Sequence, residues 1–241
     1  LSDGDVIEWF YTDDYTTEKN YEKWDDPKPS SSKSNTAENG KTDKSDTKTP
    51  ENNKGFDENT FADVKKDDWY FDAVKYVYDK GIIKGTDKGF EPNTDMSRAM
   101  LVTVLWRMEN SPVVNFAMKF NDANDGWYTE AIRWAASEGI VSGISEDTFG
   151  TDEPITREML TTILYRYAQK KNIDVSSGEN TNILSYSDAE SISEYAVSAM
   201  QWAVGEGIIK GESETLIAPD GKALRAQCAA LIMRFCEKYS K

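Results

Sequence analysis

From residue 56 to the end of the chain, apolar residues recur every three or four positions, which is the spacing of an amphipathic helix. In the middle of this part, the first such stretch contains Trp127, Ala131, Trp134 and Ala135. A second stretch contains Met159, Leu160, Ile163, Leu164 and Tyr167. Gly139 follows the first stretch, where glycine commonly ends a helix. The pattern predicts a helix, a loop and a second helix.

This helix–loop–helix pattern occurs three times. The copies share an Asp two residues after an aromatic residue, two glycines four residues apart, and an Arg that begins the second helix. In chain order these residues are Asp63, Asp122 and Asp188; Gly81, Gly139 and Gly207; Gly85, Gly143 and Gly211; and Arg98, Arg157 and Arg225. We therefore predict a mainly α fold with three repeats at residues 56–115, 116–182 and 183–241.

A single repeat of about 50 residues is too small to bury both of its apolar stripes, so we expect the three to share one core. Trp134, Trp202 and Tyr76 each stand five residues before the first turn glycine and are expected in that core. Ser97 and Thr156 are predicted N-caps of the second helices. The third copy has Leu224 there, and we expect Asp220 to cap that helix instead.

The first 55 residues differ in composition. An alternating, aromatic-rich run from Val6 to Tyr11 predicts a strand, and we interpret residues 1–26 as the end of an upstream β-containing domain. Residues 27–55 contain no apolar residue larger than Ala and are predicted to be a disordered linker. No signal peptide is visible. Because the chain begins with Leu1 and not with Met, we expect a piece of a longer or processed protein, so the missing signal says little about secretion.

Composition excludes several functions. The net charge of −15 opposes binding to nucleic acid or anionic membrane, and no apolar run reaches the roughly 20 residues of a membrane span. The chain contains no His, the commonest acid–base residue and metal ligand, so we expect no catalysis, no metal and no cofactor. Residues 121–126 (NDANDG) are acidic, but Gly126 stands where a calcium loop needs a ligand.

Cys228 and Cys236 lie about 12 Å apart along one predicted helix, too far apart for a mutual disulfide.

The repeated elements F-x-D-V, W-Y, A-I, G-I-x-x-G, F-x-P and T-R-A-E resemble the S-layer-homology family over about residues 56–241. The resemblance implies a pseudo-threefold arrangement around a central helix bundle. It also implies a secreted module, anchored non-covalently at the cell surface to a secondary cell-wall polysaccharide. That polymer typically bears pyruvylated N-acetylmannosamine and binds in grooves between repeats. The family's Arg is kept in every copy, whereas its final Glu is replaced by Met100, Met159 and Gln227.

A pyruvyl ketal gives a sugar a carboxylate, to which a guanidinium offers paired donors. On the first turn of a helix, free backbone N–H groups and the helix dipole would add to the attraction. We therefore single out Arg98, Arg157 and Arg225 as candidate ligand-binding residues. The alternative is a structural role in which each Arg pairs with an Asp of its own or a neighbouring repeat.

Other candidate ligand-binding residues accompany these arginines. Trp69 and Trp127, with Tyr195 at the matching place, offer a stacking face to a sugar, with core packing as the alternative. Asp63, Asp122 and Asp188 suit sugar hydroxyls, although turn or cap duty is favoured. Gly85, Gly143 and Gly211 allow close approach of the backbone. We expect cell-wall polysaccharide as the partner and an upstream domain as cargo; the alternative is a helical-repeat scaffold that binds protein.

Overall fold

The computed structural model describes residues 55–239. The predicted strand remnant, and all but the last residue of the predicted linker, lie outside that range. The six α-helices within it are α1 (Phe71–Asp79), α2 (Arg98–Met108), α3 (Thr129–Ser137), α4 (Arg157–Lys170), α5 (Val197–Gly205) and α6 (Arg225–Tyr239). The short 3-10 helices are η1 (Asn121–Ala123), η2 (Ser176–Asn180), η3 (Ala189–Ser191) and η4 (Glu194–Ala196). Over these residues β structure is limited to isolated bridges.

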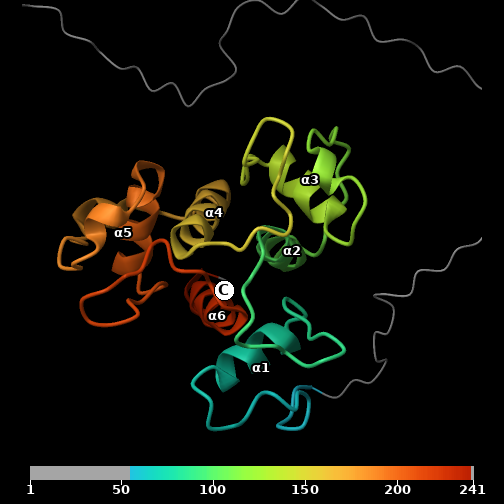
Figure 1. The fold of residues 1–241 in the computed structure, drawn as a ribbon, viewed down its shortest axis with the longest axis horizontal. Helices are drawn as coiled ribbons and strands as arrows, with labels where there is room; N and C mark the ends of the chain where they lie inside the picture. The colour runs from blue at the N-terminus through green and yellow to red at the C-terminus, as the bar shows by residue number, and fades with distance from the viewer. Residues whose placement is uncertain (1–54, 240–241) are drawn as a thin grey trace, which may run out of the picture. The chain divides into compact units, whose positions relative to one another are not determined.

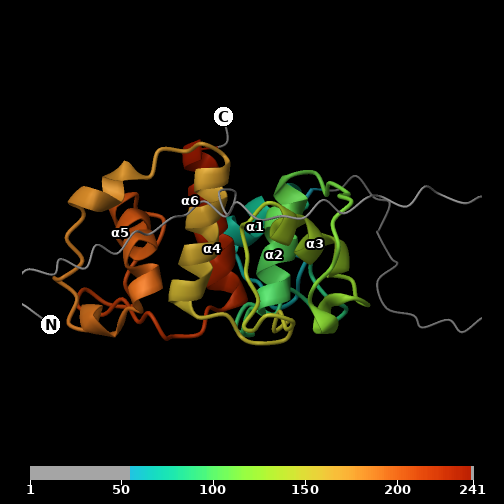
Figure 2. The same cartoon turned by 90° about the horizontal axis from the view of Figure 1, so that it is seen from above.

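Three helices form the centre of this unit, and three surround them. Figure 1 shows α2, α4 and α6 around a common axis, with α1, α3 and α5 as three outer lobes. In the perpendicular view of Figure 2 the central helices run side by side. The predicted mainly α fold, with repeats around a shared helical bundle, is confirmed.

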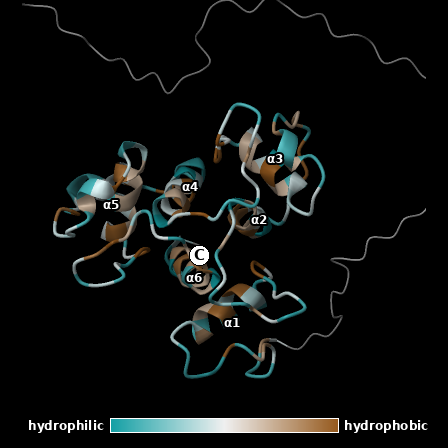
Figure 3. Ribbon diagram, viewed as in Figure 1, coloured by the Kyte–Doolittle hydropathy of each residue, from teal (hydrophilic) through white to brown (hydrophobic). Residues whose placement is uncertain are grey.

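Each outer helix packs mainly against the central helix of the preceding repeat. The pairs are α3 with α2, α5 with α4, and α1 with α6. The last pair joins the first helix of the unit to the last, so the packing closes on itself. In Figure 3 the hydrophobic sides of the outer helices turn toward the central ones. A repeat therefore depends on its neighbour to bury its apolar face.

The predicted core is largely confirmed. Trp134 and Trp202 are buried in one continuous apolar cluster, and Tyr76 is half-buried against it. Cys228 and Cys236 are buried and form no disulfide with each other, as their spacing along one helix predicts.

Helix ends follow the predicted signals in all but one case. Gly81, Gly139 and Gly207 follow the outer helices with φ of 67–69°, a conformation that favours glycine. Ser97 and Thr156 accept hydrogen bonds from Met100 N–H and Met159 N–H, which confirms both N-caps. In the third repeat the prediction for Asp220 is wrong.

The helix α6 begins at Arg225, the same repeat position as α2 and α4, so its cap position is Leu224 and Asp220 lies four residues too early to cap it. Instead the Gln227 carboxamide accepts a hydrogen bond from the Leu224 N–H at 3.1 Å. This contact is the half of a capping box that the third helical residue supplies.

A ring of three backbone hydrogen bonds joins the repeats just before the central helices begin. Met96 N–H donates to Ala223, Ala223 N–H to Ile155, and Ile155 N–H to Met96, at 2.8–2.9 Å. Each of the three residues stands two positions before the first-turn arginine of its own repeat. The ring therefore sets the three central helices at a common level.

Because α1 packs on α6, we expect a chain that ends at Lys222 to lose its cooperative fold. Removal of α6 opens the ring of backbone bonds and exposes Val74 and Val77 of α1, which are fully buried. The expected result is loss of a sharp thermal transition by circular dichroism and aggregation in gel filtration, with a chain ending at Tyr239 as the control. A monomeric short chain that melts cooperatively would contradict the closed packing.

Candidate functional site

The three predicted arginines lie at the junctions between repeats. Each guanidinium donates from Nε and Nη2 to two backbone carbonyl groups of the following repeat, and repeat 1 follows repeat 3. The acceptors are Phe149 and Ser142 for Arg98 (3.0 and 2.8 Å), Ile217 and Lys210 for Arg157 (2.9 and 2.7 Å), and Phe90 and Lys84 for Arg225 (2.8 and 3.1 Å). All three residues are 6–8% exposed. Their common role is to hold the next repeat in place.

The backbone N–H groups at these helix starts are also occupied, so the expectation that they are free to bind an anion is wrong. In α2, Arg98 N–H donates to Glu153 and Ala99 N–H to Thr151. The corresponding groups of α4 and α6 donate to the equivalent turns of repeats 3 and 1. The neighbouring repeat therefore supplies the acceptors that the first turn of each helix lacks.

The three predicted aspartates hold the same loops from the other side. Asp122 accepts from the N–H groups of Phe149 and Gly150 at 2.8 and 2.7 Å, while Arg98 binds the Phe149 carbonyl. Asp63 makes the same pair of contacts with Phe90 and Glu91. Asp188 does so with Ile217 and Ala218. Each loop is thus clamped between an Asp of its own repeat and an Arg of the preceding one.

Charge and burial act together at these clamps. Burial lowers the pKa of Arg98, Arg157 and Arg225, and the Asp of the next repeat opposes that shift; the guanidinium stays protonated at neutral pH. For Asp122 and Asp188, desolvation acts to raise the pKa, but hydrogen bonds from backbone N–H groups outweigh it and lower the pKa.

The predicted glycines make room for an aromatic ring. A Cβ atom on Gly85 would lie 2.1 Å from the Phe61 ring, and one on Gly143 would lie 2.7 Å from the Phe120 ring. At Gly211 the nearest atom would be the Ser213 carbonyl oxygen at 2.4 Å. These positions therefore let the loop close over the aromatic residue that precedes the Asp. Of the three, Gly211 also lines a cavity.

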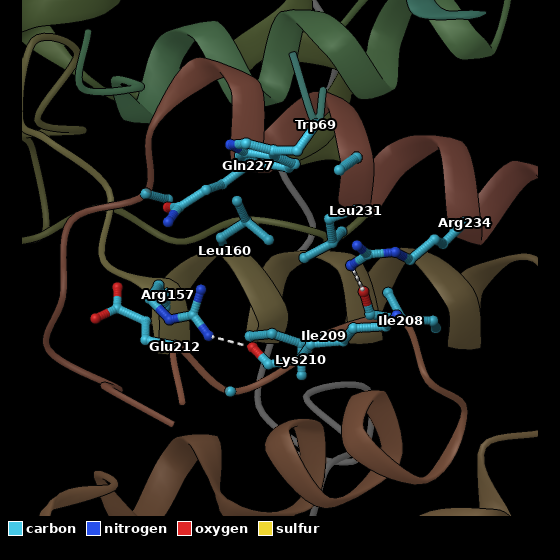
Figure 4. A pocket seen from close by; sticks show the side chains of 13 residues that line it. Trp69, Arg157, Leu160, Ile208, Ile209, Lys210, Glu212, Gln227, Leu231 and Arg234 are labelled. Carbon is cyan, nitrogen blue, oxygen red and sulfur yellow. Dashed lines mark hydrogen bonds between the residues drawn. The ribbon is translucent and has the colours of Figure 1, made fainter. Parts of the chain in front are cut away.

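That cavity, of about 540 Å³, lies in the groove between α4 and α6. It brings together three predicted site residues, Trp69, Arg157 and Gly211, one from each repeat. Figure 4 shows Trp69 and Gln227 opposite the Ile208–Lys210 segment, with the side chains of Leu160 and Leu231 between. The groove therefore combines an apolar floor with polar and aromatic walls.

Within this groove Arg157 keeps donor capacity. Its Nε and Nη2 atoms bind carbonyl groups, whereas Nη1 has no acceptor among the described residues. Trp69 is 65% exposed, so its ring is open to a ligand. Gln227 engages its carboxamide oxygen with the Leu224 N–H, which leaves the amide nitrogen available. Glu212 lies on the rim, exposed, and is the acidic residue that acts most strongly on Arg157.

The two other inter-repeat grooves differ at the corresponding residues. At Arg225, Met100 replaces Gln227 and places its sulfur 4.0 Å from Nη1. At Arg98, the counterpart of Trp69 is Tyr195, whose hydroxyl donates to the buried Glu158 carboxylate at 2.8 Å. Glu158 also accepts from the Ser193 N–H and hydroxyl groups. Trp127, 49% exposed, lies outside the α4–α6 cavity.

Sequence reasoning did not single out Gln227, Glu158 or Glu212 as groove residues. In the sequence Gln227 is one of three departures from the family motif, whereas in the structure its polar side chain distinguishes its groove from the one that contains Met100. Glu158 has no carboxylate counterpart in the other repeats, where Ala99 and Ala226 stand. A comparison of the three copies for differences, as well as for agreement, would have identified both residues.

The chain matches the family described as S-layer homology domain at residues 60–99, 119–158 and 185–229, and it belongs to that family. An amylopullulanase of Thermoanaerobacterium thermosulfurigenes is 34% identical over 74% of this chain and 10% of its own length. The S-layer protein sap of Bacillus anthracis is 37% identical over 35% of this chain and 11% of its own length. A cellulosome-anchoring protein of Acetivibrio thermocellus is 28% identical over 65% of this chain and 35% of its own length.

The chain thus spans between about a tenth and a third of these relatives. Family membership makes it a cell-wall anchoring module, located outside the cell in association with the wall. S-layer homology domains are non-catalytic and bind cell-wall polymers. No helix within residues 55–239 is long and apolar enough to cross a membrane. In the same range, no three acidic or cysteine side chains lie close enough together to hold a metal ion.

The Asp122 clamp predicts a pH dependence. Because the folded pKa is lowered, this carboxylate stabilises the fold above its unfolded pKa of about 3.9, and the contribution is lost as pH falls below that value. Asp122→Ala should lower the free energy of unfolding at pH 7 by about 2–3 kcal/mol and make its decline below about pH 4 shallower. Urea titrations at several pH values measure both effects. The exposed Asp125→Ala is the control, and equal losses in both variants would refute the clamp.

Loss of one arginine clamp should destabilise the whole unit. Arg98→Met keeps much of the volume but leaves the carbonyl groups of Phe149 and Ser142 without their donor, at an expected cost of about 2–4 kcal/mol. Arg133→Met removes only an ion pair with Glu130 near the surface and should cost less than about 1 kcal/mol. Thermal and urea unfolding compare the two. Similar stability of both variants would argue against a structural role for the first-turn arginines.

Proposed function

We propose that the chain holds an anionic secondary cell-wall polysaccharide non-covalently in the groove between α4 and α6. The observation that carries this proposal is the cavity of about 540 Å³ that unites Trp69, Arg157 and Gln227 from the three repeats. A glycan that bears a pyruvyl ketal is the ligand class that fits best, because the ketal carries a carboxylate on an otherwise neutral ring.

The Nη1 group of Arg157 is the donor for that carboxylate. The other nitrogens are already fixed to the carbonyl groups of Ile217 and Lys210, so the guanidinium is held in place before a ligand arrives. A preorganised donor loses little freedom on binding, and its low exposure strengthens the attraction to an anion. Gln227 adds an amide N–H group on the facing helix.

A sugar ring needs an apolar face as well as polar donors. Leu160 and Leu231 give the groove an apolar floor, and the exposed ring of Trp69 gives it a wall. The C–H face of a pyranose packs against such a surface while its hydroxyl groups bind polar atoms at the rim. The set of side chains therefore suits a charged sugar better than a simple anion.

The two other grooves are poorer candidates for the same ligand. The Glu158 carboxylate stands beside the groove of Arg98 and would repel an anion, and its hydrogen bond fixes the hydroxyl of Tyr195. In the groove of Arg225, Met100 takes the place of an amide donor. We therefore assign the principal site to Arg157, with Arg98 and Arg225 acting mainly as clamps between repeats.

Attachment is the whole contribution that we propose for this chain. It contains no histidine, and the carboxylates of the half-buried Asp122 and the buried Glu158 are engaged in hydrogen bonds to loops and side chains. Catalysis belongs to cargo carried elsewhere in a longer protein, as the enzyme names among the relatives suggest. The rival function, a helical scaffold that binds another protein, predicts no dependence on polysaccharide.

Variants of two exposed tryptophans at the same repeat position distinguish polysaccharide binding in the groove from a protein-binding scaffold. Trp69→Ala should weaken binding of the purified protein to bacterial cell-wall sacculi about tenfold, because the ring lines the cavity. Trp127→Ala removes an exposed ring outside that cavity, and this variant should bind like the parent. Sedimentation of protein with sacculi measures the affinity, and circular dichroism checks that both variants are folded.

A second experiment repeats the sedimentation with sacculi from which the secondary polysaccharide has been extracted. Anchoring through the groove predicts that extraction abolishes binding of the parent. Binding that survives extraction would favour a protein or peptidoglycan partner. Equal losses from the two tryptophan variants would place the site outside the α4–α6 groove.

A further inference from the structure

A second arginine follows the first on every central helix. Arg107, Arg166 and Arg234 each stand nine residues after the first-turn arginine of their helix. Nine residues make about two and a half turns, so the second arginine leaves the opposite side of its helix. Each central helix thus gives its two arginines to two different grooves. The α4–α6 cavity is accordingly lined by Arg157 from α4 and Arg234 from α6.

Arg234 is a half-buried cation without an acidic partner. Its Nη1 atom donates to the Ile208 carbonyl at 3.1 Å, its one hydrogen bond within residues 55–239. None of the ion pairs formed in that range includes it. Burial lowers its pKa, and no neighbouring carboxylate opposes the shift. Partly buried charges are usually paired, and this chain has 43 acidic residues against 28 basic ones, so an uncompensated guanidinium in a cavity points to an anionic ligand.

The two arginines of this groove stand at its opposite ends. Arg157 binds the carbonyl group of Lys210 and Arg234 that of Ile208, so both are fixed to one short segment of repeat 3. Figure 4 shows the two guanidinium groups on either side of Leu160 and Leu231. Because α4 and α6 begin at a common level, Arg234 arises about 13 Å further along the bundle than Arg157.

We propose that Arg234 forms a second anion subsite, which takes another carboxylate on the same glycan strand as the group held by Arg157. The inference rests on the proposed function and makes it more specific. The groove then selects a polymer with repeated acidic groups over a glycan with a single acidic group. The apolar floor between the two cations receives the intervening sugar.

The test compares two defined probes by isothermal titration calorimetry with the full chain. One probe is the methyl glycoside of pyruvylated N-acetylmannosamine, with one carboxylate. The other is a wall-polymer fragment of two repeating units, with two carboxylates. Arg234→Gln removes the charge but keeps an N–H donor for the Ile208 carbonyl. This variant should lose about tenfold in affinity for the longer probe and keep its affinity for the shorter one.

Two further variants control this result. Arg234→Lys restores the positive charge and should recover most of the affinity for the longer probe, which a purely structural role of Arg234 would not explain. Arg166→Gln, at the same repeat position on α4, should bind both probes like the parent. Thermal unfolding of each variant identifies any loss that comes from misfolding.

The contrary outcomes are distinct. If Arg234→Gln lowers the affinity for both probes equally, or leaves both affinities unchanged, the second subsite is overturned while the proposed function stands. If the parent binds neither probe, the proposed function is overturned and the subsite with it.

Discussion

The hydrogen bonds from a buried arginine to two carbonyl groups of the next repeat are the contacts on which the rest of this structure depends. They occur at each junction and are accompanied by helix N–H groups that bind the following turn. A guanidinium suits this task because its donors are fixed in one plane. The Asp of the receiving repeat binds the N–H groups of the same loop, so neither side of that peptide segment is left unpaired.

The junctions are alike, but the grooves beside them are not. Backbone carbonyl groups accept from all three arginines, whatever side chains the loop carries, so the fold tolerates substitutions at the groove surface. Gln227, Met100 and the Glu158–Tyr195 pair alter the chemistry of their grooves without disturbing the clamps. One module can thereby keep a threefold framework for stability and reserve one groove for an anionic ligand.

Binding of an acidic polymer by an acidic protein requires a local excess of positive charge. Within residues 55–239 most acidic side chains are exposed, where salt screens their charge, whereas Arg157 and Arg234 lie partly enclosed in the α4–α6 groove. Attraction inside the groove is therefore less screened than repulsion over the surface. Glu212 is the exception, because it is an acidic residue at the rim of the groove. Its negative charge partly offsets the positive charge of Arg157.

The sequence by itself determined the three repeats, the helix ends at Gly81, Gly139 and Gly207, the caps Ser97 and Thr156, and the buried Trp134 and Trp202. Each of these features follows from local spacing or from a residue type that one backbone conformation favours. Only the tertiary structure decided that outer helices pack on the preceding repeat, that the arginines bind carbonyl groups, and that Trp69, Arg157, Gln227 and Arg234 share one groove. Every residue carries a backbone carbonyl group, so the sequence does not indicate which carbonyl groups accept from the arginines. Residues separated by more than 150 positions meet only because the packing closes into a ring.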